Sequence, residues 1–260
     1  MHPFRRLSAV AAVACLALAA PALTPPAQAQ MSDTQRGEIE RIIRDYLLRN
    51  PEVLQEAIAE LEKKQAAAEA VKHKAAVKDN AKLLFNSTRQ VTIGNLQGDV
   101  TMVEFFDYNC GYCKRALTDM MELMKADPKL KVVLKEFPVL GPGSVEAAQV
   151  ATAVRMQDRT GKKYLEFHQK LLTGRGQIDK AKALAAAKDV GLDMARMEKD
   201  MASDEVRASL AEAMELAEKL GLNGTPSYVI GPDVVVGAVG LNALKEKVEA
   251  ARACAAKATC

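Results

Sequence analysis

The sequence has no tryptophan, few histidines and almost no surplus of either charge. Its formal net charge is +3 over 260 residues. If Arg5 and Arg6 are removed with an N-terminal export signal, 34 of the 36 basic residues remain against 33 acidic ones. Proteins that bind nucleic acids concentrate basic residues on one surface. We therefore expect no nucleic-acid partner.

Long apolar runs are restricted to the N-terminus. Two arginines precede an apolar run over residues 7–23, and small residues follow it up to Ala29. A positive start, an apolar stretch and a small-residue cleavage site are typical of an export signal. The run is broken by prolines and is short for the roughly 20 apolar residues of a membrane span. We predict a signal peptide over residues 1–29, with a lipid anchor at Cys15 as the alternative.

Cleavage after Ala29 leaves four of the five cysteines. An even number in an exported chain is typical of disulfide chemistry. A C-x-x-C pair can also form half of a zinc site, but such a site needs four ligands. Neither histidine of the mature chain, His73 or His168, lies near a cysteine in sequence. We therefore favour redox or structural roles over zinc for the remaining cysteines: Cys110, Cys113, Cys254 and Cys260.

A helical pattern covers residues 33–85 and is interrupted at Asn50-Pro51. Asn50 is suited to cap a second helix and Pro51 to begin it, so we expect a long helix from there towards Leu84. At 1.5 Å per residue, such a helix reaches roughly 50 Å. Its narrow apolar stripe must be buried against something. An association arm is one interpretation, and a helix folded back on its own domain is the other.

The rest of the chain alternates predicted strands and helices, as in an α/β fold. Apolar and β-branched runs predict the strands, and apolar repeats at three- and four-residue steps predict the helices. Asp179 and Asp193 are suited to cap helices within a long helical block. The predicted order is strands at 90–95 and 100–106, a helix from Cys110, a strand at 130–137, the helical block at 142–220, strands at 227–230 and 234–239, and a helix at 241–251.

The C-x-x-C pair lies where a predicted strand ends and a helix begins. Unpaired amide groups and the helix dipole favour a thiolate on Cys110 at this position. A thiolate is both the nucleophile and the good leaving group of disulfide exchange. Cys113 lies one helical turn further on, where it can attack a mixed disulfide on Cys110. The spacing therefore favours redox chemistry.

Two motifs, FFDYNCGYCKRA and GTPSYVIG, resemble those of the thioredoxin superfamily and, within it, the exported DsbA-like branch. The resemblance covers about residues 91–251. The segment YLLRNPEVLQEAI resembles the N-terminal region of ScsC-type proteins, some of which use such an extension to form trimers. The resemblance implies an α/β thioredoxin fold in three parts: a signal peptide at 1–29, an N-terminal helical oligomerisation region at 30–88, and a DsbA-like thioredoxin domain at 89–260 with a helical insert at about 142–222.

The same resemblance implies roles for individual residues. Cys110 matches the attacking cysteine and Cys113 the resolving one. Pro226 matches a cis-proline that faces the pair, and the backbone before it would bind an extended substrate segment by strand addition. The implied substrate-binding residues are Thr225, Pro226, Gly111 and Tyr112.

Glu104 matches a buried acidic residue that helps to move the proton of the resolving cysteine. Independently, a carboxylate inside an apolar strand is costly, so its pKa should be shifted. The alternative is an edge-strand residue that faces water. The dipeptide Gly111-Tyr112 departs from the Pro-His of DsbA, and we expect a less oxidising potential than that of DsbA.

The remaining candidates have structural or metal-binding interpretations. We interpret Cys254 and Cys260 as a structural disulfide in a loose tail after the last helix, and His168 as a packing or surface residue. We interpret two methionine groups as core: Met120, Met121 and Met124, and Met194, Met197 and Met201. Thiolates are soft ligands that select copper(I), and ScsC-like proteins are associated with copper tolerance. Cys110 and Cys113 are therefore candidate copper(I) ligands, and no other cofactor is expected beyond their own disulfide.

The combined prediction is a periplasmic thiol-disulfide oxidoreductase that acts on exported proteins with cysteines. A membrane partner of unknown identity would maintain its redox state. The N-terminal arm favours an oligomeric isomerase or reductase, as a trimer or else a dimer, because several active sites held around one client act together. The alternatives are a DsbA-like oxidase and a protein that binds copper or holds clients.

Overall fold

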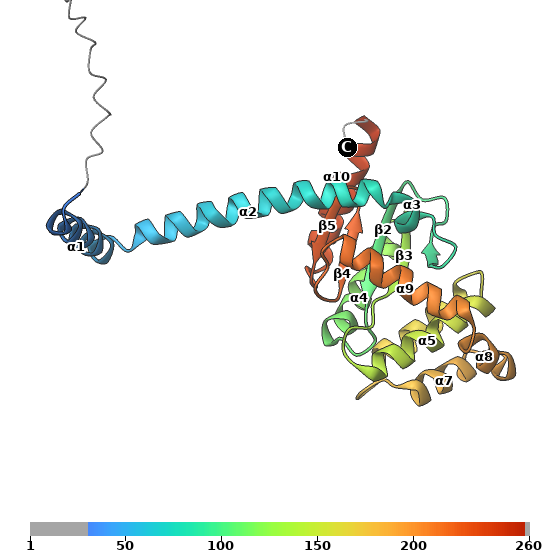
Figure 1. The fold of residues 1–260 in the computed structure, drawn as a ribbon. Coiled ribbons are helices and arrows are strands. Elements are labelled where there is room, and N and C mark those ends of the chain that lie inside the picture. Colours follow the sequence, from blue (N-terminus) through green and yellow to red (C-terminus); the bar gives the residue numbers. More distant parts are fainter. Residues whose placement is uncertain (1–30, 258–260) are drawn as a thin grey trace, which may run out of the picture. The chain divides into compact units, whose positions relative to one another are not determined.

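The computed structural model describes residues 31–257, which form ten helices and one five-stranded sheet (Figure 1). The chain divides into two compact units, Met1–Ala59 and Glu60–Cys260. The expected signal peptide, Cys15 and Cys260 lie outside the described residues. No helix within residues 31–257 is long and apolar enough to cross a membrane.

The first unit contains helix α1 (Asp33–Arg49) and the beginning of α2 (Glu52–Asp79). A capping box between Ser32 and Gln35 begins α1. The prediction that Asn50 caps the second helix is wrong: its side-chain amide donates to the Tyr46 carbonyl at 2.9 Å and so ends α1. No side chain of residues 33–49 is buried.

The second unit begins within α2, which is shorter than predicted. The helix ends at Asp79, and α3 (Ala81–Phe85) follows as a separate element. Asn80 separates the two helices, and its side-chain amide donates to the Ala76 carbonyl at 2.8 Å. Asparagine competes in this way with the continuing helical hydrogen bonds.

The sheet has the strand order β1-β3-β2-β4-β5. Its central strands β2 and β3 are parallel, and every other pair is antiparallel. Parallel strands are normally covered on both faces, and β2 is accordingly buried along almost its whole length. The bounds are β1 (Val91–Gly94), β2 (Val100–Phe106), β3 (Leu130–Glu136), β4 (Ser227–Ile230) and β5 (Asp233–Val236).

Helices cover both faces of this sheet (Figure 1). One buried cluster joins side chains of β2 and β3 to helices α4, α6 and α10, while a second joins the opposite face to α3 and α9. Met120 and Met197 are fully buried in the first cluster, so both methionine groups contribute to the core. The helices that follow α3 are α4 (Gly111–Ala126), α5 (Pro142–Gln157), α6 (Lys162–Thr173), α7 (Lys180–Asp189), α8 (Met194–Met201), α9 (Asp204–Lys219) and α10 (Leu241–Lys257).

The predicted helical block consists of five helices, with α5 packed against the other four. Asp179 and Asp193 cap α7 and α8 as expected, each by accepting a backbone N–H. The last helix is longer than predicted, because α10 continues to Lys257. Cys254 therefore lies on a helix, and the expectation of a loose tail at this residue is wrong.

Candidate active site

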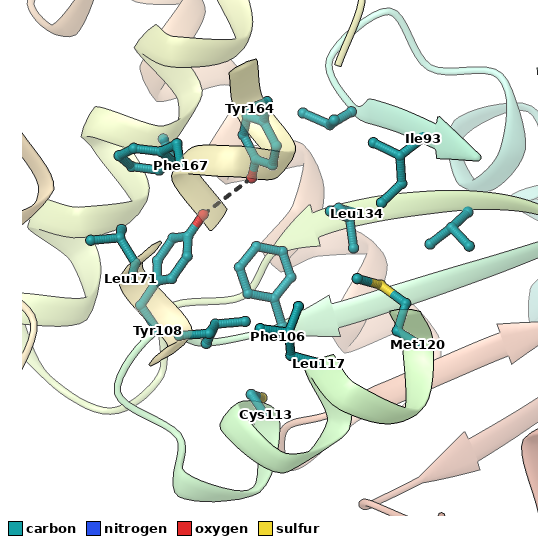
Figure 2. Close-up of a cluster of buried hydrophobic side chains, with 14 of the residues drawn as sticks. Ile93, Phe106, Tyr108, Cys113, Leu117, Met120, Leu134, Tyr164, Phe167 and Leu171 are labelled. Atoms are coloured by element: carbon teal, nitrogen blue, oxygen red, sulfur yellow. Dashed lines mark hydrogen bonds between the residues drawn. The ribbon is translucent and has the colours of Figure 1, made fainter. Parts of the chain in front are cut away.

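The C-x-x-C pair lies at the junction of β2 and α4. Cys110 is the N-cap residue of α4, and its backbone N–H donates to the Asp107 carbonyl at 3.1 Å. Both thiols are free, and their residues are almost inaccessible, with 6% exposure at Cys110 and 0% at Cys113. Figure 2 shows Cys113 at the start of α4, among the buried side chains that include Phe106 and Leu117. Cys110 is thus the cysteine nearer to solvent.

The GTPSYVIG motif contacts the C-x-x-C motif at Cys110. The Thr225–Pro226 peptide bond is cis, and the Cys110 thiol donates to the Thr225 carbonyl oxygen at 3.1 Å. Strand β4 begins directly after this bond and pairs with β2, the strand that precedes the cysteines in the chain. Pairing of these two strands thus brings two distant parts of the sequence together.

Glu104 lies in the middle of β2, opposite Leu134 of β3 and Tyr228 of β4. It is 1% exposed, which excludes the alternative of a water-facing residue on an edge strand. Among the described residues, none forms a hydrogen bond with its Oε2 atom. Burial, with a smaller contribution from Asp119, raises the pKa of Glu104 to about 8. This carboxyl can therefore gain or lose a proton near neutral pH.

The Cys113 thiol is held in its protonated form. Burial raises the pKa of Cys113 well above its usual value. Hydrogen bonds from the Asp107 backbone and from Thr225 act in the opposite direction, and the negative charge of Glu104 raises the pKa further. Cys113 needs a nearby proton acceptor before it can act as a nucleophile, and Glu104 is the buried carboxyl that influences it.

The residues between the cysteines are open to solvent. A Cβ atom added to Gly111 would meet no heavy atom of the described residues within 4 Å. Tyr112 is 58% exposed, and the Arg115 guanidinium carbon lies 4.4 Å from the centre of its ring. These two positions therefore present open surface beside Cys110. Their expected role in substrate binding stays a prediction.

Two other predicted residues lie apart from this chemistry. His168 is a packing residue: it is buried, its ring contacts Phe106 edge-to-face at 4.6 Å, and burial lowers its pKa to about 3. Cys254 is disulfide-bonded, and its predicted partner Cys260 lies outside the described residues. Within residues 31–257, no group of three or more histidine, cysteine or acidic side chains could hold a metal ion.

The three residues directly before Cys110 form a further part of the site, for which the sequence predicts no role. Asp107, Tyr108 and Asn109 all contact the helical block through their side chains. The available signal was polar residues between a buried strand and a helix N-cap, where a side chain can bind backbone groups. Their partners are distant in sequence, so the pattern alone does not identify them.

Two family profiles match this chain. Residues 101–249 match the DSBA-like thioredoxin domain. Residues 35–68 match the N-terminal domain of the copper resistance protein ScsC. Both matches agree with the resemblance found in the sequence, and the first confirms the expected thioredoxin fold.

Similar solved structures and curated proteins include DsbA-like and ScsC proteins, in agreement with the two family profiles. A thioredoxin-like oxidoreductase from Silicibacter pomeroyi DSS-3 is 44% identical, with a TM-score of 0.63 over 66% of this chain and 97% of that chain. A linker-deletion mutant of Proteus mirabilis ScsC is 29% identical, with a TM-score of 0.64, and the match covers 87% of this chain and 99% of that chain. The thiol:disulfide interchange protein DsbA of Bordetella pertussis is 27% identical over 139 residues, which are 52% of this chain and 64% of that protein.

The chain spans less than two thirds of the length of the Bordetella pertussis protein and about a quarter of two other curated relatives. Besides the Bordetella protein, two Na(+)/H(+) antiporter NhaA proteins, from Salinispora arenicola and Salinispora tropica, are 27% and 26% identical. These alignments cover 24% of each antiporter.

Proposed function

The chain belongs to the family of DSBA-like thioredoxin domains, and from this premise we propose that it exchanges thiols and disulfides with exported proteins in the periplasm. The observation that carries the proposal is the position of Cys110. Cys110 is the N-cap residue of α4 and the more accessible cysteine of the pair. Its thiol lies 3.1 Å from the carbonyl oxygen of Thr225, the residue that precedes a cis-proline. A substrate disulfide can reach this sulfur over the open surface at Gly111 and Tyr112.

The reaction uses two sulfur atoms and one buried carboxyl. The Cys110 thiolate attacks a client disulfide, forms a mixed disulfide with one client sulfur, and releases the other as a thiolate. Cys113 then gives its proton to Glu104 and attacks Cys110. The Cys110–Cys113 bond forms, and the second client sulfur leaves as a thiolate. The client has gained two electrons, and the reverse sequence oxidises a client dithiol.

The N-terminal helices favour an oligomeric isomerase over a monomeric oxidase. Four apolar side chains of α1 follow one another at helical spacing and are 43–58% exposed: Ile39, Ile42, Ile43 and Tyr46. A wide apolar stripe on an exposed helix is stabilised by burial against another surface. This region matches the ScsC N-terminal domain, so we favour a homotrimer, with a dimer as the alternative. Several active sites around one client then raise the effective concentration of thiols.

The deciding experiment measures recovery of activity from a test enzyme with scrambled disulfides. The chain from Gln30 onward is added in a mild redox buffer, with a Cys110→Ser variant as the control. Recovery well above the rate in buffer alone supports an isomerase. Fast oxidation of a reduced peptide without such recovery would instead identify a DsbA-like oxidase. Either role needs a membrane redox partner, which coupled assays with membrane extracts would detect.

Copper(I) binding is a second candidate because two free thiols with suitably soft sulfur atoms lie one helical turn apart. Cys110 and Cys113 would be the ligands, and residues 31–257 offer no cluster with a third. The bound ion would block both sulfurs and so stop exchange. Competition between the reduced protein and a copper(I) chelator tests this role. A Cys113→Ser variant that competes as well as the wild type would exclude the pair as the site.

A further inference from the structure

The three residues before Cys110 are each fixed to the helical block by a different contact. We infer that this DYN segment, residues Asp107, Tyr108 and Asn109, is a positioning element that holds Cys110 at the geometry needed for closing the Cys110–Cys113 bond. The inference rests on the proposed function, since it concerns the second step of thiol-disulfide exchange. It assigns a role to the inserted helices, which carry neither cysteine.

Asp107 ties the segment to the chain that follows β3. Its carboxylate is buried and accepts four hydrogen bonds. Oδ2 accepts the backbone N–H groups of Val139 and Leu140 at 2.9 and 3.0 Å. Oδ1 accepts the Ser144 hydroxyl at 2.7 Å and the Asn109 backbone N–H at 2.8 Å. The carboxylate therefore connects the DYN segment to the start of α5.

Asn109 ties the segment to the chain just before α7. Its Oδ1 accepts the Ile178 backbone N–H at 2.7 Å. Its Nδ2 donates to the Ile178 carbonyl at 2.9 Å and to the Ser144 hydroxyl at 3.0 Å. One side chain thus binds both backbone groups of a distant residue, as a strand partner would. Ser144 is common to both polar anchors.

Tyr108 provides an apolar anchor between them. Figure 2 shows its ring within the buried cluster, near Phe106, Phe167 and Leu171. The ring lies edge-to-face with Phe106 at 5.1 Å and with Phe167 at 6.0 Å. Its hydroxyl lies 3.4 Å from that of Tyr164 on α6. Rotation of the segment would break this packing.

These anchors determine where Cys110 lies. The Cys110 backbone N–H binds the Asp107 carbonyl, and its thiol reaches Thr225. Attack by Cys113 is intramolecular, and its rate depends on the alignment of the reacting atoms, such that a displacement of about 1 Å can slow a reaction roughly a hundredfold. A loosened segment should slow ring closure more than the first attack, which a freely diffusing reagent makes from solution.

Ellman's reagent separates the two steps in the full mature chain. The Cys110 thiolate attacks the aromatic disulfide, forms a mixed disulfide and releases one thionitrobenzoate anion. Cys113 then gives its proton to Glu104, from which it passes to the buffer, and attacks Cys110. The internal disulfide forms and a second thionitrobenzoate leaves. The two electrons of the dithiol reduce the reagent, and each release is followed by absorbance.

Asn109→Ala is the test variant and Asn95→Ala its matched control. Asn95 also fixes a loop by accepting one backbone N–H, that of Gln97, and donating to one carbonyl, that of Pro128. It lies at the other end of the sheet, beside the start of β3. We expect Asn109→Ala to slow the second release by about tenfold or more, with the first release little changed and Asn95→Ala like the wild type. Ser144→Ala, a smaller change, should slow it in the same direction.

Amide hydrogen exchange of the reduced protein measures the local stability of residues 107–113 directly, without any redox chemistry. Exchange over residues 107–113 should rise in Asn109→Ala and remain unchanged in Asn95→Ala. An unchanged second release in a folded Asn109→Ala protein, or equal slowing in both asparagine variants, would overturn the inference, as would unchanged exchange. A wild-type protein that releases no second thionitrobenzoate would instead contradict the proposed function. Hydrogen exchange would still decide whether the DYN segment holds Cys110 in place.

Discussion

At the scale of single residues, Glu104 is the group whose chemistry follows most directly from its position. Its pKa of about 8 allows proton exchange with Cys113 near neutral pH. We expect Glu104→Gln to slow the second release of thionitrobenzoate by about tenfold or more, because general acid–base catalysis typically contributes at least that much. Glu136→Gln is the matched control: Glu136 is partly buried, and desolvation also raises its pKa to about 8, but its partners are Tyr164 and Tyr108. Equal rates in the two variants would remove Glu104 from the mechanism.

The same carboxyl should make stability depend on pH. The folded protein keeps a proton on Glu104 up to about pH 8, whereas the unfolded chain releases it near the ordinary pKa of 4.5. Stability is therefore lost as pH rises between these values, by a few kcal/mol at about 1.4 kcal/mol per pKa unit. Urea unfolding at pH 5 and pH 8.5 should show a smaller loss in Glu104→Gln than in the wild type. Glu136 titrates over the same range in both proteins, so its contribution cancels when their losses of stability are compared. Identical losses in the wild type and in Glu104→Gln would contradict a buried Glu104 carboxyl with a raised pKa.

At the scale of elements, a helix cap found in the sequence gives a stability prediction. The Asp193 side chain accepts the Arg196 backbone N–H at 3.0 Å and begins α8. Asp193→Ala should lower the free energy of unfolding by about 1 kcal/mol, the usual cost of losing an N-cap. Urea unfolding monitored by circular dichroism measures this change. Asp189→Ala, at the exposed end of α7, is the control; a similar loss there would mean that the cap is not the cause.

Sequence patterns predicted the bounds of an element well where its apolar run and its local capping signals indicate the same ends. The strand over Val100–Phe106 has its predicted bounds, because a continuous apolar run enters a sheet covered on both faces. The helix ends near Asp79 and Lys257 were not predicted. The first depends on a side-chain bond from Asn80. The second follows from alanine-rich sequence, which continues a helix without any apolar repeat.

At the scale of the whole molecule, only part of the candidate active site can be predicted from the sequence. Spacing identified the two cysteines, and an apolar strand around a carboxylate suggested a shifted pKa for Glu104. The meeting of Cys110 with Thr225 was expected only from resemblance, because it depends on the pairing of β2 with β4. The contacts of Asn109 with Ile178 were missed altogether. They depend on how the inserted helices pack, which no local pattern encodes.

The proposed assembly leads to a prediction about α1. Ile39 lies within its exposed apolar stripe, whereas Thr34 lies about 140° away around the helix at about 100° per residue. We expect Ile39→Glu to weaken association, because burying an unpaired charge in an apolar interface is costly. Light scattering should show a lower mass for Ile39→Glu and an unchanged mass for Thr34→Glu.

The same pair of variants tests whether assembly serves isomerisation. Recovery of the scrambled enzyme should fall in Ile39→Glu, since it needs several sites around one client. Thionitrobenzoate release should stay at the wild-type rate, since one Cys110–Cys113 pair completes that reaction. A dissociated variant that still rescues the scrambled enzyme would show that each thioredoxin domain isomerises alone, and the exposed stripe of α1 would then need a different partner.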